Sequence, residues 1–301
     1  MKEIVLITGA GGMVAQQLAN QLKQNYSIRF LTRKPNKNNE FQWDIRNNKI
    51  DPDAFKDVNH IIHLAGTSVA KKRWTKKRKD EIISSRVDGA TLIQQELIKQ
   101  GKVIDSFISA SAIGFYGNKT TNKVYSEDDP SGSDFLSTVC QKWELAAQSF
   151  KISNVAKRVS ILRIGMVLSP NGGVLQNLMP LTKFYLGAAF GNGKQYNPWI
   201  HIEDLCNMIE YILNDKSASG TFNAVAPEHS TNKELITEIA KAMNRKVILP
   251  NIPKFTISLL LGEMSKLFLE GNKVSSEKIR NLGFKFEYPK LKDALENLLN
   301  N

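Results

Sequence analysis

Short apolar runs alternate with helically spaced apolar positions along the first half of the chain. The runs predict strands near residues 3–8, 27–32, 60–65, 103–109 and 158–164. The helical spacing predicts helices near 12–24, 76–99 and 134–150. In the second of these helices, Ile83, Val87 and Ala90 are expected to share one face. Because a crossover between parallel strands is right-handed and carries a helix, this order predicts a doubly wound parallel sheet.

The pattern changes after about residue 166. Two glycine-rich loops, at 169–173 and 187–198, flank a short apolar helix, and residues 221–225 are expected to return to the sheet as a strand. The remainder predicts a helix at 231–243, a strand near 246–249 and a long apolar helix near 254–269.

These elements predict an α/β fold with two parts. Residues 1–166 plus about 201–226 are expected to form a Rossmann-type domain with a doubly wound parallel sheet. Residues of about 167–200 plus 227–301 are expected to form a smaller C-terminal α+β lobe that binds substrate.

The first strand runs directly into a glycine loop, GAGGMVA, and the loop runs directly into a helix. Gly9 allows a sharp turn, and Gly12 allows the backbone to approach a pyrophosphate. The amides and dipole of the following helix favour that anion. The third glycine position holds Ala15, whose single methyl the packing should tolerate. The alternative interpretation is an ordinary glycine turn before a helix.

The second strand ends in Thr32-Arg33-Lys34. An NAD site usually has an acidic residue at this point, where it binds the ribose 2′-hydroxyl. A cation there suits a 2′-phosphate instead. The position of Arg33 therefore predicts NADP as the cofactor.

The composition is that of a globular protein with a large core, because the chain has 301 residues and ordinary apolar and charged fractions. We find no apolar run long enough to span a bilayer and no signal-peptide pattern, so we expect a cytoplasmic protein without a membrane partner. Cys140 and Cys206 lack disulfide or metal spacing, and the four histidines form no ligand pattern. The sequence predicts reduced thiols and no metal.

The net charge of +12 is concentrated in one place, because KKRWTKKRK at 71–79 has seven basic residues. Nucleic-acid binding is one interpretation of such a run. The alternative is a solvated loop and helix start beside a phosphate-rich cofactor. We favour the second, since no nucleic-acid-binding motif and no interleaved aromatic series accompany the run.

With these residues laid out, the chain resembles an atypical extended short-chain dehydrogenase/reductase. It resembles the "epimerase family" subgroup, which has an NADP-binding fold and a C-terminal extension of unknown function. The similar motifs include HLAG at 63–66, RWTKKRKDEIISSR at 73–86, SASAIGFYG at 109–117, DFLSTVCQKWE at 134–144, RIGMVLSPNGG at 163–173, GNGKQYNPWIHIEDL at 191–205 and LLGEMSKLFLEGNKV at 260–274. The resemblance covers essentially the whole chain.

The resemblance implies cofactor contacts spread over both parts of the chain. They are Gly9, Gly12, Met13 and Val14 at the pyrophosphate, Thr32 and Arg33 at the 2′-phosphate, Asp44 at the adenine, Leu64 and Ala65 along the ribose and phosphates, Glu81 and Arg86 on the long helix, and Met166 at the nicotinamide. For Glu81 and Arg86, an ordinary pair on the helix surface is the alternative.

The usual catalytic pair of this superfamily, Tyr-x-x-x-Lys, is missing. Its tyrosinate acts as acid or base, and its lysine lowers the tyrosine pKa. A glutamate commonly follows the lysine by four positions. If Glu144 is that glutamate, Cys140 occupies the lysine position and Leu136 the tyrosine position.

Ser111 and Tyr116 are the remaining catalytic candidates. The resemblance implies that Ser111 orients a substrate oxygen, and Tyr116 could supply a phenol from another direction. The alternatives are a strand-end hydroxyl bonded to backbone and a packing aromatic. Further candidates for substrate contact are Lys194, Gln195 and Trp199.

Two residues of the IHIED segment, His201 and Asp204, have structural interpretations. We expect Asp204 to cap the following helix and His201 to support the loop. A catalytic His201 is the alternative.

Two functions follow from these residues. The favoured one is an NADP-dependent oxidoreductase or epimerase-like enzyme acting on an unidentified small molecule. The other is a non-catalytic NADP(H)-binding sensor or regulator, suggested by the missing pair. Extended members often pair through two long helices, so a homodimer is a possible assembly.

Overall fold

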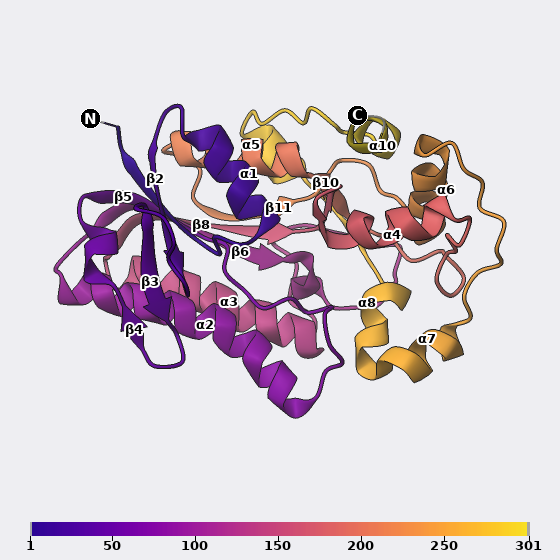
Figure 1. Ribbon diagram of the computed structural model, residues 1–301, viewed down its shortest axis with the longest axis horizontal. Coiled ribbons are helices and arrows are strands. Elements are labelled where there is room, and N and C mark those ends of the chain that lie inside the picture. Colours follow the sequence, from indigo (N-terminus) through magenta and orange to yellow (C-terminus); the bar gives the residue numbers. More distant parts are fainter. Residues whose placement is uncertain (1, 300–301) are drawn as a thin grey trace.

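The centre of the fold is an eight-stranded sheet, shown by a computed structural model that describes residues 2–299 (Figure 1). The strand order is β11-β8-β6-β5-β1-β2-β3-β4, with every neighbouring pair parallel except β3 and β4. The strands are β1 (Ile4–Thr8), β2 (Ser27–Thr32), β3 (Glu40–Asp44), β4 (Lys49–Ile50), β5 (Val58–His63), β6 (Ile104–Ala112), β8 (Ala156–Ile164) and β11 (Gly220–Ala224). The α/β Rossmann-type prediction is confirmed.

Helices cover both faces of this sheet, as the doubly wound prediction requires (Figure 1). The helices α1 (Met13–Leu22) and α5 (Ile202–Asn214) lie on one face, and α2 (Lys76–Lys99) and α3 (Phe135–Ile152) lie on the other. The chain leaves β1 toward β2 on one side and later returns to β5 on the other side. The switch point, where ligands bind in such folds, therefore lies between the carboxyl ends of β1 and β5.

The remaining elements form the second part and the connections. Two small parallel ladders pair β9 (Met166–Ser169) with β10 (Trp199–His201) and β7 (Val124–Tyr125) with β12 (Lys273–Val274). The other helices are α4 (Gly173–Lys183), α6 (Asn232–Ala242), α7 (Lys254–Leu261), α8 (Lys266–Leu269), α9 (Glu277–Asn281) and α10 (Leu291–Leu299), with 3₁₀ turns η1 (Pro52–Phe55), η2 (Ile113–Tyr116) and η3 (Gly262–Ser265).

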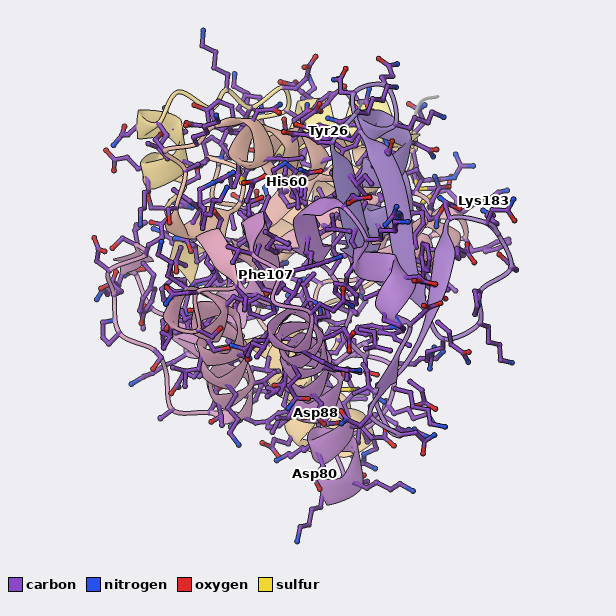
Figure 2. The ribbon with its side chains drawn as sticks, turned by 90° about the vertical axis from the view of Figure 1, so that its left-hand side faces the viewer. Tyr26, His60, Asp80, Asp88, Phe107 and Lys183 are labelled. Carbon is purple, nitrogen blue, oxygen red and sulfur yellow. The ribbon has the colours of Figure 1, made fainter. Side chains whose placement is uncertain are left out.

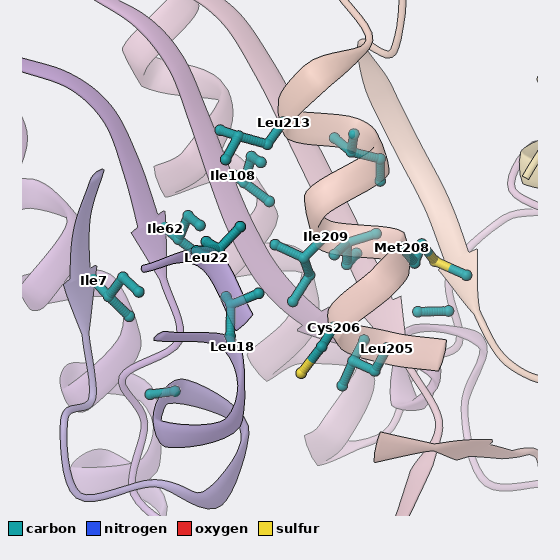
Figure 3. Packing of buried hydrophobic residues seen from close by; sticks show 14 of the residues in the cluster. Ile7, Leu18, Leu22, Ile62, Ile108, Leu205, Cys206, Met208, Ile209 and Leu213 are labelled. Carbon is teal, nitrogen blue, oxygen red and sulfur yellow. The ribbon is translucent and has the colours of Figure 1, made fainter. Parts of the chain in front are cut away.

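Alternation along the strands divides the core between the two faces of the sheet. On β1, Ile7 faces the α1 and α5 layer, whereas Leu6 faces the α2 and α3 layer. Figure 3 shows Leu18 of α1 directed toward Ile209 of α5 in the first layer. In the second layer, Phe107 lies at the centre of the view in Figure 2 and stacks on Phe150.

A third cluster of buried apolar residues lies in the C-terminal part, between α4, α6 and α10, and includes Trp199 and Leu235. Ile279 and Phe284, although late in the chain, pack with the α1 and α5 layer. The predicted division of the chain into two domains stays a prediction. No helix within residues 2–299 has the length and apolar character needed to cross a membrane.

Two local predictions were wrong. Residues 246–249 form no strand, and Ile248 is largely exposed. The apolar run expected as one helix over 254–269 is broken at Gly262, whose φ of +59° lies in the left-handed region. In α2, Ile83, Val87 and Ala90 belong to one continuous helix, and of these three Ala90 is buried whereas Ile83 and Val87 are half-buried.

The third correction concerns the start of α5. Its N-cap is His201, whose Nδ1 accepts a hydrogen bond from the amide of Glu203 at 3.1 Å. Asp204 lies inside the first turn and accepts from the amides of Glu287 and Tyr288 instead. Asp204 therefore fixes the segment before α10 to α5.

We expect Leu18→Ala to destabilise the fold strongly. Leu18 is fully buried between α1 and the sheet, so truncation removes apolar contacts and leaves a cavity. Such changes cost about 2–5 kcal/mol. The measurement is the free energy of unfolding in urea. The matched control is Leu145→Ala on the exposed side of α3, which should change it by less than about 0.5 kcal/mol. Equal effects would contradict this assignment of the core.

Candidate functional site

The chain turns sharply at Gly9, where β1 meets the loop after β5. Gly9 has φ +83°, and a Cβ there would lie 3.2 Å from the amide nitrogen of Ala65 and 3.3 Å from the carbonyl carbon of Leu64. A side chain would therefore be strained by the backbone angle and crowded by the neighbouring strand's loop. The glycine is required by this close approach at the switch point.

The N-terminus of α1 has no side-chain cap. Gly12 is the N-cap, and its amide donates to the carbonyl of Gly9 at 2.8 Å. A Cβ on Gly11 would meet nothing within 4 Å, so the space beside the loop is open. Met13 and Val14 are the first residues of this helix, and no side chain accepts a hydrogen bond from its first amides. These free amides favour the binding of an anion.

Thr8 fixes the position of the loop after β5. Its Oγ1 accepts hydrogen bonds from the amides of Leu64, at 3.1 Å, and Ala65, at 3.0 Å. The same oxygen lies 3.0 Å from Nδ1 of His63, whose Nε2 lies 3.4 Å from the carbonyl oxygen of Arg86. Because His63 is fully buried, desolvation lowers its pKa to about 4, and the ring is neutral near pH 7.

Met13 also contacts the second part of the chain. A Cβ on Gly172 would lie 2.6 Å from Sδ of Met13, and one on Gly173 would lie 3.3 Å from its Cε. The glycines of the 169–173 loop therefore allow that loop to lie against the start of α1. Met166, the predicted nicotinamide contact, begins β9 just before this loop, and its amide donates to the carbonyl of Pro198.

The predicted 2′-phosphate and adenine residues lie together at one side of the sheet. Thr32 ends β2 and pairs with Gln42 of β3, and Asp44 ends β3. Arg33 follows Thr32 directly and is exposed, and it has no hydrogen-bond or ion-pair partner among the described residues. Its guanidinium is thus accessible to a ligand.

Asp44 is held in a turn. Its carboxylate accepts from the amides of Arg46, at 3.0 Å, and Asn47, at 3.3 Å, and from the Asn47 side chain at 2.6 Å. The bonds from Asn47 and Arg46 lower the pKa of Asp44, so the carboxylate stays ionised. It lies at the carboxyl end of β3, and its contact with an adenine stays a prediction.

Arg86 supports the 64–67 loop from behind. It is buried, its Nη1 donates to the carbonyls of Thr67, at 3.0 Å, and Ile82, at 2.9 Å, and its guanidinium lies 4.8 Å from the Trp143 ring centroid. A Cβ on Gly66 would lie 3.1 Å from Cζ of Arg86. Burial lowers the pKa of Arg86 to about 10, so it remains a cation at neutral pH.

Glu81 is paired within its own helix. Its Oε2 accepts from Nη1 of Arg78 at 3.1 Å, and both side chains stay partly exposed. Nη2 of Arg78 also donates to the carbonyl of Ser68. Arg78 therefore links this pair to the loop beyond residue 66. A contact between Glu81 and a cofactor stays a prediction.

Leu136, Cys140 and Glu144 lie on one face of α3, which is turned toward the end of β6. A Cβ on Gly114 would lie 3.3 Å from Cβ of Leu136 and 3.7 Å from Sγ of Cys140, and that thiol lies 3.5 Å from the carbonyl oxygen of Ala112. The two positions inferred for the missing pair thus face the expected strand end. Burial raises the pKa of Cys140 to about 12, so it is a neutral thiol.

Ser111 is bonded to the same helix. It is buried on β6, and its Oγ donates to Oε1 of Glu144 at 2.7 Å. Glu144 also accepts from Nε and Nη2 of Arg163, each at 2.9 Å, in a buried pair with bidentate geometry. A substrate-orienting role for Ser111 stays a prediction.

Tyr116 continues this network. Its hydroxyl donates to Oδ1 of Asn223 at 2.7 Å and accepts from Nη1 of Arg163 at 2.9 Å. Burial raises the pKa of Tyr116 to about 12, although Arg163 and Asn223 act in the opposite direction. The phenol is therefore protonated near neutral pH, and both of its hydrogen-bonding directions already have protein partners.

The candidate substrate residues of the second part have structural partners. Gln195 donates to the carbonyls of Phe190, at 3.1 Å, and Phe268, at 2.6 Å, and Trp199 is fully buried and donates to Ser230 at 3.0 Å. Lys194 is exposed. His201 caps α5 and stacks on Tyr288, so the structure gives it a supporting position.

Sequence reasoning missed three polar residues that hold the site together: Thr8, His63 and Arg163. Each is buried inside or at the end of a strand, where the spacing of polar residues does not distinguish a residue of a hydrogen-bond network from any other residue of the sheet.

Within the described part of the chain, no three His, Cys, Asp or Glu side chains gather closely enough to hold a metal ion.

The family model described as "NAD dependent epimerase/dehydratase family" matches residues 5–225. The chain belongs to this family. A second model, a domain of unknown function (DUF1731), matches residues 252–298, which contain α7, α8 and most of α10.

Relatives of this family extend over nearly the whole chain. The epimerase family protein SA0724 of Staphylococcus aureus (strain N315) is 35% identical over 301 residues, covering 98% of each chain. The epimerase family protein ML0860 of Mycobacterium leprae is 33% identical over 297 residues, covering 98% of this chain and 95% of the relative. A crystal structure of the human epimerase family protein SDR39U1 with NADPH has a TM-score of 0.88 and 26% identity, covering 99% of both chains.

We expect the stability of the fold to fall between about pH 6.5 and pH 4 because of His63. The pKa of His63 is about 4 in the folded state, below its ordinary value of 6.5, so the unfolded chain binds this proton first as the pH falls. The loss amounts to about 3 kcal/mol, at about 1.36 kcal/mol per pKa unit. Urea unfolding across this range measures it.

The control for this pH dependence is His63→Asn, which keeps a polar group beside Thr8 but cannot titrate. Its stability should fall less steeply over the same range. His201, whose burial also lowers its pKa to about 4, continues to contribute in both proteins. Identical pH profiles for the two proteins would contradict the assignment of a buried neutral His63.

Proposed function

We propose that this chain binds NADP(H) at the carboxyl ends of β1, β2 and β5, with Arg33 at the 2′-phosphate. The observation that carries the proposal is the exposed Arg33, which has no partner within residues 2–299 and follows β2, the strand paired with the one that leads to the uncapped start of α1. Two anionic groups of one dinucleotide would thus meet a free guanidinium and a helix N-terminus. The human relative crystallised with NADPH supports the same cofactor.

The residues present fit such a group. Gly9 is required by the tight turn against Leu64 and Ala65, and the space beside Gly11 is open, since a Cβ there would meet nothing within 4 Å. Gly12 allows the backbone itself to approach a pyrophosphate. The neutral His63 adds no charge beneath the loop, and the ionised Asp44 at the end of β3 would lie beside the adenine.

We expect Arg33→Ala to weaken NADPH binding about 10- to 150-fold while changing NADH binding little. The lost interaction is a charge-assisted contact worth about 1.5–3 kcal/mol, and only NADPH carries the 2′-phosphate. Equilibrium titrations of both nucleotides measure the difference. The matched control is Lys37→Ala, another exposed cation four positions further along.

Two outcomes would contradict this cofactor assignment. One is equal affinity of the wild-type protein for NADPH and NADH. The other is a loss of NADPH affinity in Lys37→Ala as large as in Arg33→Ala, which would indicate a diffuse attraction to positive charge. The first outcome would exclude a contact between the protein and the 2′-phosphate. The second would exclude a specific role of Arg33 in that contact.

For the reaction, we propose an oxidoreductase or epimerase-like enzyme that acts on an unidentified small molecule near the end of β6. The cofactor would supply or accept a hydride. Leu136 cannot exchange a proton, and the buried Cys140 thiol is neutral, so neither replaces the missing Tyr-x-x-x-Lys pair. Ser111 and Tyr116 are the hydroxyls placed at this strand end, joined through Glu144 and Arg163.

We expect Ser111→Ala and Tyr116→Phe each to slow hydride transfer by at least about tenfold, because either change alters one network at the end of β6. The measurement is transfer of deuterium from C4-deuterated NADPH to a mixture of carbonyl metabolites, read by mass spectrometry. Tyr26→Phe, which changes a tyrosine bonded to Asn214 far from this network, is the control. Unchanged transfer in both variants would exclude Ser111 and Tyr116 from the reaction.

A non-catalytic NADP(H) sensor is the second candidate. It is favoured by the apolar Leu136 and the neutral Cys140 at the two positions of the usual pair. This function requires a clear difference in affinity between NADPH and NADP, together with no transfer of deuterium to any metabolite. Deuterium in a metabolite would exclude the sensor.

A further inference from the structure

One edge of the C-terminal part exposes large apolar side chains beside cations. We call this edge the lobe rim and define it as residues 181–186, 245–249 and 254–260. Its exposed apolar residues are Leu181, Phe184, Tyr185, Leu186, Val247, Ile248, Leu249, Phe255, Leu259 and Leu260. Phe184 is 71% exposed and Phe255 is 73% exposed. Exposed patches of this kind mark surfaces that contact a partner or a membrane.

A hydrogen bond and a cation–ring contact connect the first two segments of the lobe rim, and a backbone hydrogen bond fixes the chain just before the third. Nε of Arg245 donates to the carbonyl of Lys183 at 3.4 Å, and its guanidinium lies 5.5 Å from the ring centroid of Tyr185. The amide of Ile252 donates to the carbonyl of Ala189 at 2.8 Å, just before α7 begins. In Figure 1 the chain between α6 and α7 follows the outer edge of this part of the molecule.

The charge of the lobe rim has one sign. Its three segments contain Lys183, Arg245, Lys246 and Lys254 and no Asp or Glu. Lys254 lies 3.6 Å from a carboxylate outside the rim, that of Glu270. The other three cations have no ion-pair partner within residues 2–299.

A basic hollow opens beside these cations. Its volume is about 540 Å³, and its lining includes Lys233, Lys241, Arg245 and Lys246 together with Val247 and Leu249, but no carboxylate. Lys241 is paired with Glu238 at 2.6 Å, and Glu238 does not line the hollow. The hollow therefore suits a phosphate group, and apolar side chains flank its basic residues.

We propose that the lobe rim docks on an anionic phospholipid surface. The apolar side chains enter the boundary between headgroups and acyl chains, and the cations contact the phosphates, with the hollow receiving one headgroup. The contact is peripheral, so it requires no membrane-spanning helix. This proposal differs from the expectation of no membrane partner. That expectation was based on the lack of an apolar run long enough to span a bilayer, whereas the lobe rim is formed by segments that only the folded structure brings to the surface.

Charge also argues against a second copy of this chain as the occupant. In a two-fold dimer the same patch faces itself, so the three cations of one rim that have no ion-pair partner within residues 2–299, Lys183, Arg245 and Lys246, would meet the same three of the other. Phe184 and Phe255 protrude rather than line a groove, which suits a fluid surface better than a shaped partner. An anionic bilayer satisfies both features.

Cosedimentation of the full chain with lipid vesicles tests the proposal. We expect binding to vesicles of phosphatidylcholine mixed with phosphatidylglycerol, and at least about tenfold weaker binding to phosphatidylcholine alone. Added salt should weaken the binding. Phe184→Ser/Phe255→Ser should weaken partitioning about tenfold. Lys183→Gln/Lys246→Gln should weaken it about fivefold for each cation removed, at roughly 1 kcal/mol per charge.

Two matched controls distinguish vesicle binding by the lobe rim from nonspecific binding. Leu145→Ser/Ile152→Ser removes apolar residues that are 64% and 81% exposed on α3, and Lys76→Gln/Lys77→Gln removes two cations from the basic segment 71–79. Both controls should bind vesicles like the wild type. Thermal unfolding of every variant confirms that the fold is retained.

Three results would overturn the proposal. They are equal or absent binding to both vesicle types, equal losses in the controls and the rim variants, and a concentration-dependent dimer in sedimentation that only the rim variants abolish. The last result would make a second copy the occupant. None of them depends on NADP(H) binding, because the rim variants leave Arg33 and the glycine loop unchanged.

Discussion

The site depends on how closely the end of β1 approaches the loop after β5. Thr8 accepts two amide hydrogen bonds from Leu64 and Ala65, and Gly9 leaves no room for a Cβ against the same residues. The neutral ring of His63 also contacts Oγ1 of Thr8 through its Nδ1. Because these bonds join the two strands at the switch point, they fix where the start of α1 points and so where an anion would bind.

The rest of the site is built outward from this contact. Arg86 and Arg78 hold the 66–68 loop by its carbonyls, and Met13 receives the 169–173 loop because glycines there leave space. Farther along the sheet, Glu144 and Arg163 form a buried pair at the end of β6. A buried pair of this kind need not add stability, but it fixes geometry around Ser111 and Tyr116.

The sequence predicted the sheet and the glycine turn between β1 and α1, because these rest on local periodicity and on Gly9. It could not predict the Thr8–His63 contact or the Arg163 pair, which join residues far apart in the chain. It also mistook the apolar run at 246–249 for a strand and the 254–269 run for one helix, because an exposed apolar residue such as Ile248 is locally identical to a buried one. The first of these errors lies within the lobe rim, and the second run begins there.

A crystal structure of the protein grown with NADPH is the decisive measurement, because we propose that the carboxyl edge of β1, β2 and β5 binds one NADP(H) molecule. We expect the 2′-phosphate against Arg33, the pyrophosphate at the start of α1, and the nicotinamide between Met166 and the end of β6. A nucleotide bound only in the basic hollow beside α6, or an empty carboxyl edge at saturating NADPH, would overturn this proposal.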